Sequence, residues 1–203
     1  MSYATANERY LATLVNQARR AEGLAPLALE KRLNDSAEAH SRWMLNADVF
    51  SHTGQGGSSS RQRMEQAGFD LAGRWMTAEN LAYVSISGEA DLRDEIRQLH
   101  QNLMNSPGHY ANIMSDAAYV GIGLEAGVMT IGGRDYRVLM VTQNFADTDG
   151  QVRLEELIAD GVLCATAAAF AFTRLEFPGR VLMYRILLIG LLLPPPAVAI
   201  ALF

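Results

Sequence analysis

The stretch Ser106-Pro-Gly-His-Tyr-Ala-Asn-Ile-Met114 is the segment around which the rest of the sequence can be arranged. Ser106 is a typical helix N-cap and Pro107 fits the first helical position, so we expect a helix to begin here. His109 then lies in the first turn, where the positive end of the helix dipole favours a neutral imidazole. A neutral histidine can bind a metal or accept a proton, although a histidine that only hydrogen-bonds to the backbone is the commoner role.

Length and composition limit the possible classes of protein. The 203 residues suit one domain of ordinary size with an extension. The net charge of −5 argues against a protein that binds nucleic acid. The adjacent basic pairs Arg19-Arg20 and Lys31-Arg32 have the character of solvent-facing helix surfaces. Cys164 is the single cysteine, so the chain has no internal disulfide.

The spacing of apolar residues predicts alternating helices and strands. Thr5-Ala-Asn-Glu8 fits a capping box, and the helix that it opens is expected to stop at Gly23. A second helix follows, with Leu29, Leu33, Ala37, His40 and Met44 on one face. A short helix over 61–67, a strand over 77–84, a helix over 92–103 and two strands over 120–125 and 136–145 complete the pattern. This order indicates helices packed on an antiparallel sheet.

Three polar residues in these elements are candidates for function. His40 lies on the apolar face of a helix. At such a position a histidine is more often a hydrogen-bonded core residue than a ligand. His52 follows Phe50 just outside a helix, a position that could place it at the rim of a cavity. Glu79 is a carboxylate early in an otherwise apolar strand, so it is either an edge residue or a functional acid.

Taken together, several segments resemble one family, the CAP domain of cysteine-rich secretory proteins, antigen 5 and pathogenesis-related proteins, in a bacterial form without disulfides. The matching segments follow in family order over about residues 5–146. They are Asn16-Gln-Ala-Arg19, Gly23-Leu-Ala-Pro-Leu27, Ala37-Glu-Ala-His-Ser41, Phe50-Ser-His52, Ala78-Glu-Asn-Leu81, Ser106-Pro-Gly-His109 with Asn112-Ile113, Gly121-Ile-Gly123 and Val141-Thr-Gln-Asn-Phe145.

The resemblance implies an α+β fold, a three-layer α-β-α sandwich with a central, mainly antiparallel sheet. In the family a central cavity is lined by two histidines and one or two acids, sometimes with a divalent metal. By the matching motifs, His52, Glu79 and His109 would take the positions of these cavity residues. Asn80 and Asn112 belong to the same expected cavity. Two imidazoles and a carboxylate are a sensible zinc set with one position open for water.

The sequence also departs from the family pattern. Many members carry a tryptophan followed three residues later by a glutamate, where Leu103 and Ser106 stand here, so the second carboxylate is missing. Glu95 or His100 could compensate, although neither matches the motif. The family usually has a leader peptide, and the first ten residues here lack the basic and apolar regions of one.

The last part of the chain has a different character. We expect a CAP domain over 1–148 and a C-terminal extension over 149–203. Residues 181–203 are almost wholly apolar, but Arg185 and Pro194-Pro-Pro196 interrupt them, which disfavours a membrane-spanning helix. A membrane-associated tail or a disordered end are both compatible with this composition.

Three functions follow from these residues and the resemblance. The first is extracellular or cell-envelope binding of a lipid, sterol or other small ligand, with a divalent metal such as zinc in the cavity. The second is a hydrolase in which Glu79 or a histidine acts as general base on metal-bound water. The third is a structural or signalling module whose polar cluster is a core network.

Overall fold

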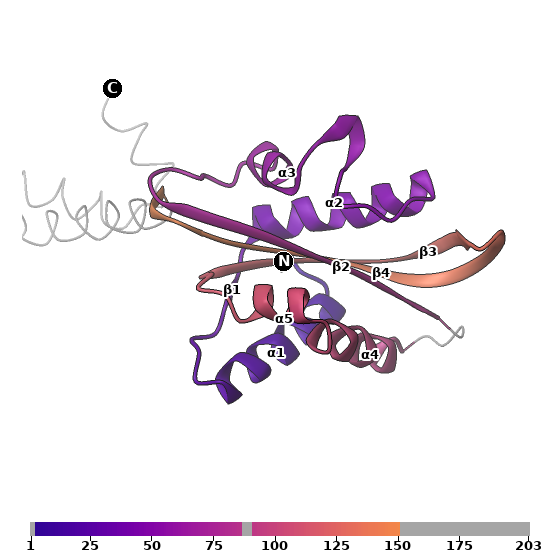
Figure 1. Ribbon diagram of the computed structural model, residues 1–203, viewed down its shortest axis with the longest axis horizontal. Coiled ribbons are helices and arrows are strands. Elements are labelled where there is room, and N and C mark those ends of the chain that lie inside the picture. Colours follow the sequence, from indigo (N-terminus) through magenta and orange to yellow (C-terminus); the bar gives the residue numbers. More distant parts are fainter. Residues whose placement is uncertain (1–2, 87–90, 151–203) are drawn as a thin grey trace, which may run out of the picture. The chain divides into compact units, whose positions relative to one another are not determined.

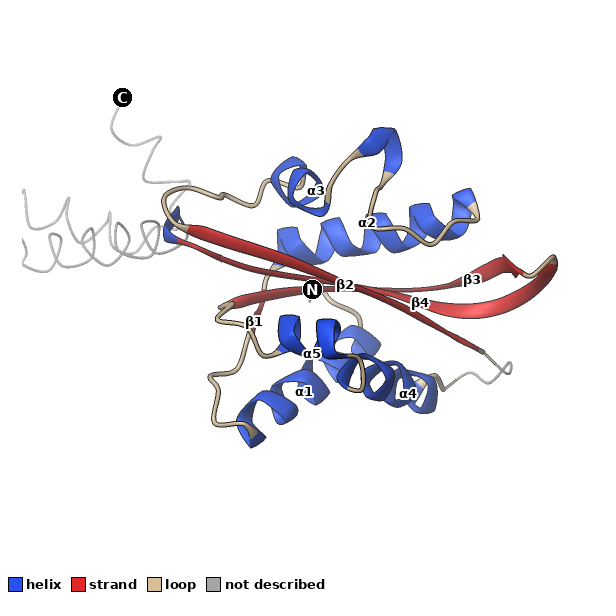
Figure 2. Cartoon of the chain, viewed as in Figure 1, coloured by secondary structure: helices blue, strands red, loops and turns tan. Residues whose placement is uncertain are grey.

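The computed structural model describes residues 3–86 and 91–150, which form a three-layer α-β-α sandwich (Figure 1). Helices α2 (Lys31–Ala47) and α3 (Ser60–Gln66) cover one face of the sheet, together with the short helix η1 (Gln55–Gly57). Helices α1 (Ala6–Ala21), α4 (Arg93–Met104) and α5 (Pro107–Ile113) cover the other face (Figure 2). The expected fold class is therefore confirmed.

The sheet has four strands in the order β1-β3-β4-β2. Strands β2 (Trp75–Ser85), β3 (Tyr119–Ile131) and β4 (Arg134–Thr148) pair antiparallel, and the two-residue strand β1 (Ala28–Leu29) pairs parallel with β3. The sequence pattern missed β1 and assigned Leu29 to the second helix. Two residues are too few to show a strand period, and only pairing with β3 makes this segment a strand.

Local sequence signals explain where the helices begin. The Thr5 capping box is present in full, because the Thr5 hydroxyl accepts from the Glu8 amide and the Glu8 carboxylate accepts from the Thr5 amide. Ser106 and Pro107 occupy the N-cap and N1 positions of α5 as expected, but the Ser106 hydroxyl makes no capping hydrogen bond. Pro107 and the packing of α5 therefore contribute more to this helix start than the serine side chain does.

Two glycines fix the distance between α2 and the sheet. A Cβ on Gly121 would lie 2.0 Å from the carbonyl carbon of Leu33, and one on Gly123 would lie 2.2 Å from the Glu38 amide nitrogen. Both are close-packing positions, because a side chain on either would overlap the α2 backbone. The α2 backbone thus lies directly on β3, which places the side chains of α2 at a defined height above the strand.

Arg19 corrects an expectation about surface charge. The Arg19-Arg20 pair was expected to face solvent, yet Arg19 is 3% exposed. Its guanidinium donates to the carbonyl oxygens of Ala25, Ile113 and Ser115 at 2.8, 2.7 and 2.8 Å. The guanidinium thus supplies donors to carbonyl groups at the C-terminal ends of α1 and α5, where these groups have no partner within their own helix. Sequence spacing cannot reveal this role because the accepting carbonyls come from distant segments.

The expected division at residue 148 falls at the last residue of β4. Apart from Asp149 and Gly150, the expected extension over 149–203 lies outside the described residues, as does its apolar end, so this division stays a prediction. In the parts of the chain that the structure does describe, no helix has both the length and the apolar character needed to cross a bilayer.

Candidate functional site

Glu79 lies on β2, the edge strand of the sheet, and faces α2 and α3. Successive residues of a strand point to opposite faces, and Leu81 packs with Met44 of α2 while Ala78 and Ala82 pack against the opposite core. Glu79 shares the face of Leu81, and its side chain is only 3% exposed. A carboxylate this deeply buried requires partners, because an unpaired buried charge is costly.

Two side chains supply those partners. The Nδ1 atom of His52 lies 2.9 Å from Glu79 Oε1, and an Arg63 terminal nitrogen donates to Oε2 at 2.6 Å. His52, in the loop after α2, is 63% exposed and so lies at the rim, whereas Arg63 of α3 is 10% exposed. The expected proximity of His52 and Glu79 is present, and both carboxylate oxygens of Glu79 are occupied.

Arg63 is the residue that sequence reasoning missed. Besides Glu79, its guanidinium donates to the carbonyl oxygens of His52 and Ser58 at 3.1 and 2.8 Å. It therefore holds the loop that carries His52 against the carboxylate. A basic residue in a short polar helix gives no sequence signal for this role, because the contact joins residues 16 positions apart.

Asn80 and Asn112, also expected in the cavity, link β2 to α5. Asn80, adjacent to Glu79, donates to the backbone oxygen of His109 and to Gln143 Oε1, both at 3.1 Å. Asn112 of α5 donates to Asn80 Oδ1 at 2.8 Å and to the Glu79 backbone oxygen at 3.4 Å. This amide network ties α5 to the edge strand and positions the helix turn that carries His109.

The pKa of His109 is lowered, first by burial and then by the charge of His52. The direction agrees with the neutral imidazole expected from the sequence, although the cause is burial and a neighbouring histidine. No hydrogen bond joins the His109 ring to His52 or Glu79 among the residues described. His52 and His109 thus lie close enough to interact electrostatically without forming one bonded cluster with Glu79.

This arrangement does not fit a metal ion as it stands. Over residues 3–86 and 91–150, no three His, Cys, Asp or Glu side chains are placed to hold one. A tetrahedral zinc site needs ligand atoms with free lone pairs at about 2.0–2.2 Å from the ion. Here an arginine cation already occupies one Glu79 oxygen and His52 the other. Glu95 and His100, considered above as substitutes, lie on α4 and have no described contact with His52 or Glu79.

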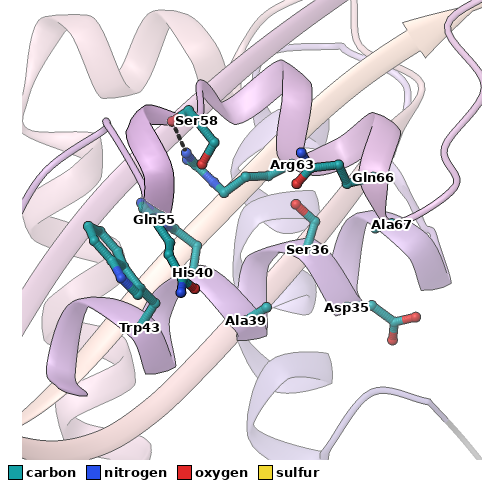
Figure 3. Close-up of a pocket in the computed structure, with 10 residues that line it drawn as sticks. All are labelled: Asp35, Ser36, Ala39, His40, Trp43, Gln55, Ser58, Arg63, Gln66 and Ala67. Carbon is teal, nitrogen blue, oxygen red and sulfur yellow. Dashed lines mark hydrogen bonds between the residues drawn. The ribbon is translucent and has the colours of Figure 1, made fainter. Parts of the chain in front are cut away.

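A cavity of about 420 Å³ opens beside Arg63, between α2 and the η1–α3 segment. Figure 3 shows side chains of α2 on one side of it and those of the η1–α3 segment on the other. The ten lining residues are Asp35, Ser36, Ala39, His40, Trp43, Gln55, Ser58, Arg63, Gln66 and Ala67. Seven of them are polar, and they include the half-buried Arg63 and the buried His40.

His40 is the core histidine that its apolar stripe predicts, with 1% exposure. Its Nε2 atom lies 3.0 Å from the Ser51 carbonyl oxygen, and its ring stacks on Trp43 with centroids 5.5 Å apart. A carbonyl only accepts, so Nε2 carries the proton. Burial and the nearby Arg63 charge lower the pKa of His40, which favours the neutral ring. Within residues 3–86 and 91–150, its buried Nδ1 has no hydrogen-bond partner.

Comparison with known proteins agrees with the fold and with the family resemblance of the sequence. The model of the CAP family, described as the cysteine-rich secretory protein family, matches residues 12–145. The chain belongs to this family. The resemblance expected from the sequence motifs is therefore confirmed.

Three known proteins are similar to this chain in sequence or in fold. The chain is 28% identical over 122 residues to the "Uncharacterized membrane protein YlbC" of Bacillus subtilis, which is 60% of this chain but 32% of that protein. The structure of an outer surface protein from Borrelia burgdorferi matches 70% of this chain and 93% of its own, with TM-score 0.53 and 16% identity. An extracellular protein containing an SCP domain from Bacillus anthracis matches 68% of this chain and 39% of its own, with TM-score 0.49 and 25% identity.

The coverage and the sequence identity limit what each comparison shows about this chain. This CAP chain spans about a third of the length of the Bacillus subtilis relative, so it corresponds to one part of that protein. At 16% identity, the likeness to the Borrelia structure shows the fold alone.

Proposed function

We propose that this CAP protein is a binding module that takes a small polar molecule into the cavity between α2 and α3. The observation that carries the proposal is the cavity of about 420 Å³, in which seven of the ten lining residues are polar. Gln55 and Gln66 in this lining are exposed, so their side-chain amides can donate to and accept from a ligand.

The lining favours a polar ligand over the lipid or sterol first considered. A lipid site needs a continuous apolar wall, whereas only Ala39, Trp43 and Ala67 among the ten lining residues are apolar. Its size lies toward the lower end of the roughly 300–1,000 Å³ typical of small-molecule pockets. The family's secretory members support a role outside the cytoplasm or at the cell envelope, and membrane association through residues 149–203 belongs to the same proposal.

The experiment that tests binding is a screen of small polar and apolar fragments by protein-observed NMR on the full chain. We expect polar fragments to shift backbone signals of α2 and α3, and Trp43→Ala to abolish those shifts. Trp75→Ala is the matched control, because Trp75 lies on β2 outside the cavity. If no fragment shifts the α2 and α3 signals, the proposal is wrong.

Metal binding is a second proposal that rests on His52 and Glu79. A zinc ion there has to displace Arg63 from Glu79 Oε2, so Arg63→Met should raise the affinity for zinc above that of the wild-type chain. Arg61→Met is the control, since Arg61 is exposed and contacts Glu65 instead. Calorimetric titration with zinc measures both. Equal zinc affinity in Arg63→Met and wild type would contradict the competition.

Catalysis is supported by one feature, the pairing of His52 with Glu79. A carboxylate that orients an imidazole at 2.9 Å is an arrangement used in general-base catalysis, and the exposed His52 ring is open to a substrate. A hydrolase role predicts ester hydrolysis that His52→Ala removes, while His100→Ala leaves the rate unchanged. Equal rates of ester hydrolysis in His52→Ala and His100→Ala would contradict the hydrolase role, and binding would remain as the proposed function.

A further inference from the structure

Strand β3 has a free edge beyond its short pairing with β1. Only Tyr119 and Val120 pair with β1, so within the described residues the rest of β3, up to Ile131, has β4 on one side and no strand on the other. In Figure 1 the hairpin of β3 and β4 extends past the end of α2. The N–H and C=O groups along such an edge are open to pairing with a strand of another chain.

Every second residue of β3 directs its backbone groups away from β4 at this edge. The Val120 carbonyl accepts from the Glu30 amide, which lies outside the β3–β4 pair. Because the backbone groups of a strand alternate between its two sides, the even-numbered residues that follow Val120 also face outward. The edge therefore presents the amides of Ile122, Leu124, Ala126, Val128 and Thr130.

Side chains occupy three of these amides. The acceptors are Asn34 Oδ1 for Ile122 at 2.9 Å, Glu8 Oε1 for Leu124 at 3.3 Å and Asp48 Oδ1 for Thr130 at 2.7 Å. Each oxygen takes the place that a carbonyl oxygen of a neighbouring strand would take. Side chains that satisfy an edge in this way oppose its pairing with other chains.

The amides of Ala126 and Val128 remain open between these acceptors. Both residues are exposed, Val128 to 53%, and neither amide has a hydrogen-bond partner within residues 3–86 and 91–150. This open stretch is symmetric about Gly127. A second copy running antiparallel about Gly127 would place Ala126 of each copy opposite Val128 of the other, and each such pair can exchange N–H and C=O groups.

Asp48 limits this pairing to two residues from each copy. The next pair outward sets Leu124 of one copy against Thr130 of the other, and Asp48 already holds the Thr130 amide. About four backbone hydrogen bonds are then available. A ladder this short gives little stability in water. Hydrogen bonding to Thr130 lowers the pKa of Asp48, so the carboxylate stays ionised and accepts hydrogen bonds at neutral pH.

The backbone at Asp48 also points to this role. Asp48 is the C-cap residue of α2, in the left-handed conformation with φ 52°. Among the residues that the structure describes, it is the one non-glycine residue with positive φ. Glycine is the usual residue at such a position, followed by asparagine. The contact with Thr130 gives a physical reason for an aspartate where glycine would carry no strain.

We propose that the β3 edge around Gly127 is a pairing surface for a second copy of this chain, and that Asp48 keeps this surface closed. The edge of the wild-type chain is therefore expected to be unpaired. The inference goes beyond the proposed binding function and does not depend on it, because neither the edge residues nor Asp48 line the α2–α3 cavity.

The test replaces Asp48 in the full chain. Asp48→Gly removes the acceptor and suits the positive φ, so the variant should fold. Asp48→Asn is the matched control, since its amide oxygen can still accept from Thr130 and asparagine also tolerates this conformation. Amide hydrogen exchange is followed residue by residue by NMR at increasing protein concentration. It reports on this edge even when another part of the chain self-associates.

We expect the amides of Ala126 and Val128 to exchange fast in the wild type and in Asp48→Asn at every concentration. In Asp48→Gly the exchange of both amides should slow by about tenfold on concentration, because pairing protects them. Adding Val128→Pro to Asp48→Gly removes one outward amide at an exposed edge position, so it should abolish the concentration dependence. Thermal melts of every variant show whether the fold is kept.

Three outcomes overturn the proposal. Slow exchange of Ala126 and Val128 in the dilute wild type would show that the edge is already covered. Exchange in Asp48→Gly that does not depend on concentration would show that the edge does not pair. Equal slowing in Asp48→Gly and Asp48→Asn would assign the effect to the charge of Asp48 and not to its hydrogen bond with Thr130.

Discussion

At the scale of single residues, the contact between His52 and Glu79 depends on Arg63, which neutralises the buried Glu79 carboxylate. Glu79 would cost several kcal/mol if its charge were buried alone, and Arg63 offsets that cost at 2.6 Å. The same guanidinium fixes the loop of His52 through two carbonyl oxygens. One side chain of α3 therefore determines both the electrostatics of the cluster and the position of its exposed histidine.

His40 makes stability depend on pH. Burial and Arg63 lower its pKa in the folded state, while Glu79 and the Ser51 carbonyl oppose the shift and the His52 charge adds to it. The unfolded chain then binds more protons as pH falls below about 6.5, so the stabilisation is complete above that pH and is lost below it. We expect the free energy of unfolding, measured by urea denaturation, to fall between pH 7.5 and pH 5.

His40→Gln tests this assignment, because glutamine can still donate to the Ser51 carbonyl but does not titrate. The variant should reduce the slope of stability against pH by up to about 1.4 kcal/mol per pH unit, the value for one proton. Trp43→Phe retains His40 and its titration, so it should keep the wild-type slope. An unchanged slope in His40→Gln would show that His100 and His109, whose pKa values are also lowered, account for the effect.

At the scale of elements, the site depends on how closely α2 approaches the sheet. Gly121 allows the α2 backbone at Leu33 to lie on β3, and β4 joins β3 to the edge strand of Glu79. The distance between α2 and the sheet thus sets the height of the α2 side chains, including His40, above the strands. The approach of the helix is a structural requirement of the site as well as of the core.

Gly121→Ala should therefore destabilise the protein strongly. The added Cβ would lie 2.0 Å from a backbone carbon, which cannot move as a side-chain end can, so we expect a loss of about 3 kcal/mol or more. Gly108→Ala in α5 is the matched control, since no atom lies within 4 Å of its Cβ position. Alanine is favoured over glycine in helices, so the control should be neutral or stabilising by up to about 1 kcal/mol. Urea denaturation that gave the two variants equal stability would contradict the close contact.

At the scale of the whole described domain, Arg19 joins segments about 94 residues apart. Its removal would leave the carbonyl groups of Ile113 and Ser115 without this donor, so Arg19→Met should cost about 3 kcal/mol or more in the free energy of unfolding. Arg20→Met, at an exposed position on the same helix, should change it by less than about 0.5 kcal/mol. Thermal and urea unfolding of both variants measure the difference, and equal losses would place Arg19 at the surface after all.

Some features of this protein follow from its sequence alone. Helix starts and the strand alternation around Val120 and Ile122 are local signals, because each depends on neighbours within a few residues. The ordered motifs identified the family, and the apolar stripe of α2 placed His40 in the core. These properties need no knowledge of the folded arrangement.

The contacts between residues far apart in the sequence were decided by the tertiary structure. Strand alternation puts the side chains of Glu79 and Asn80 on opposite faces, so Glu79 bonds to His52 and Arg63 while Asn80 bonds to the α5 segment. Arg63 reaches Glu79, and Arg19 reaches Ile113, only because the sheet brings distant segments together. Buried polar groups take whichever partners the packed layers provide, and that choice depends on three-dimensional distance, which spacing along the chain does not encode.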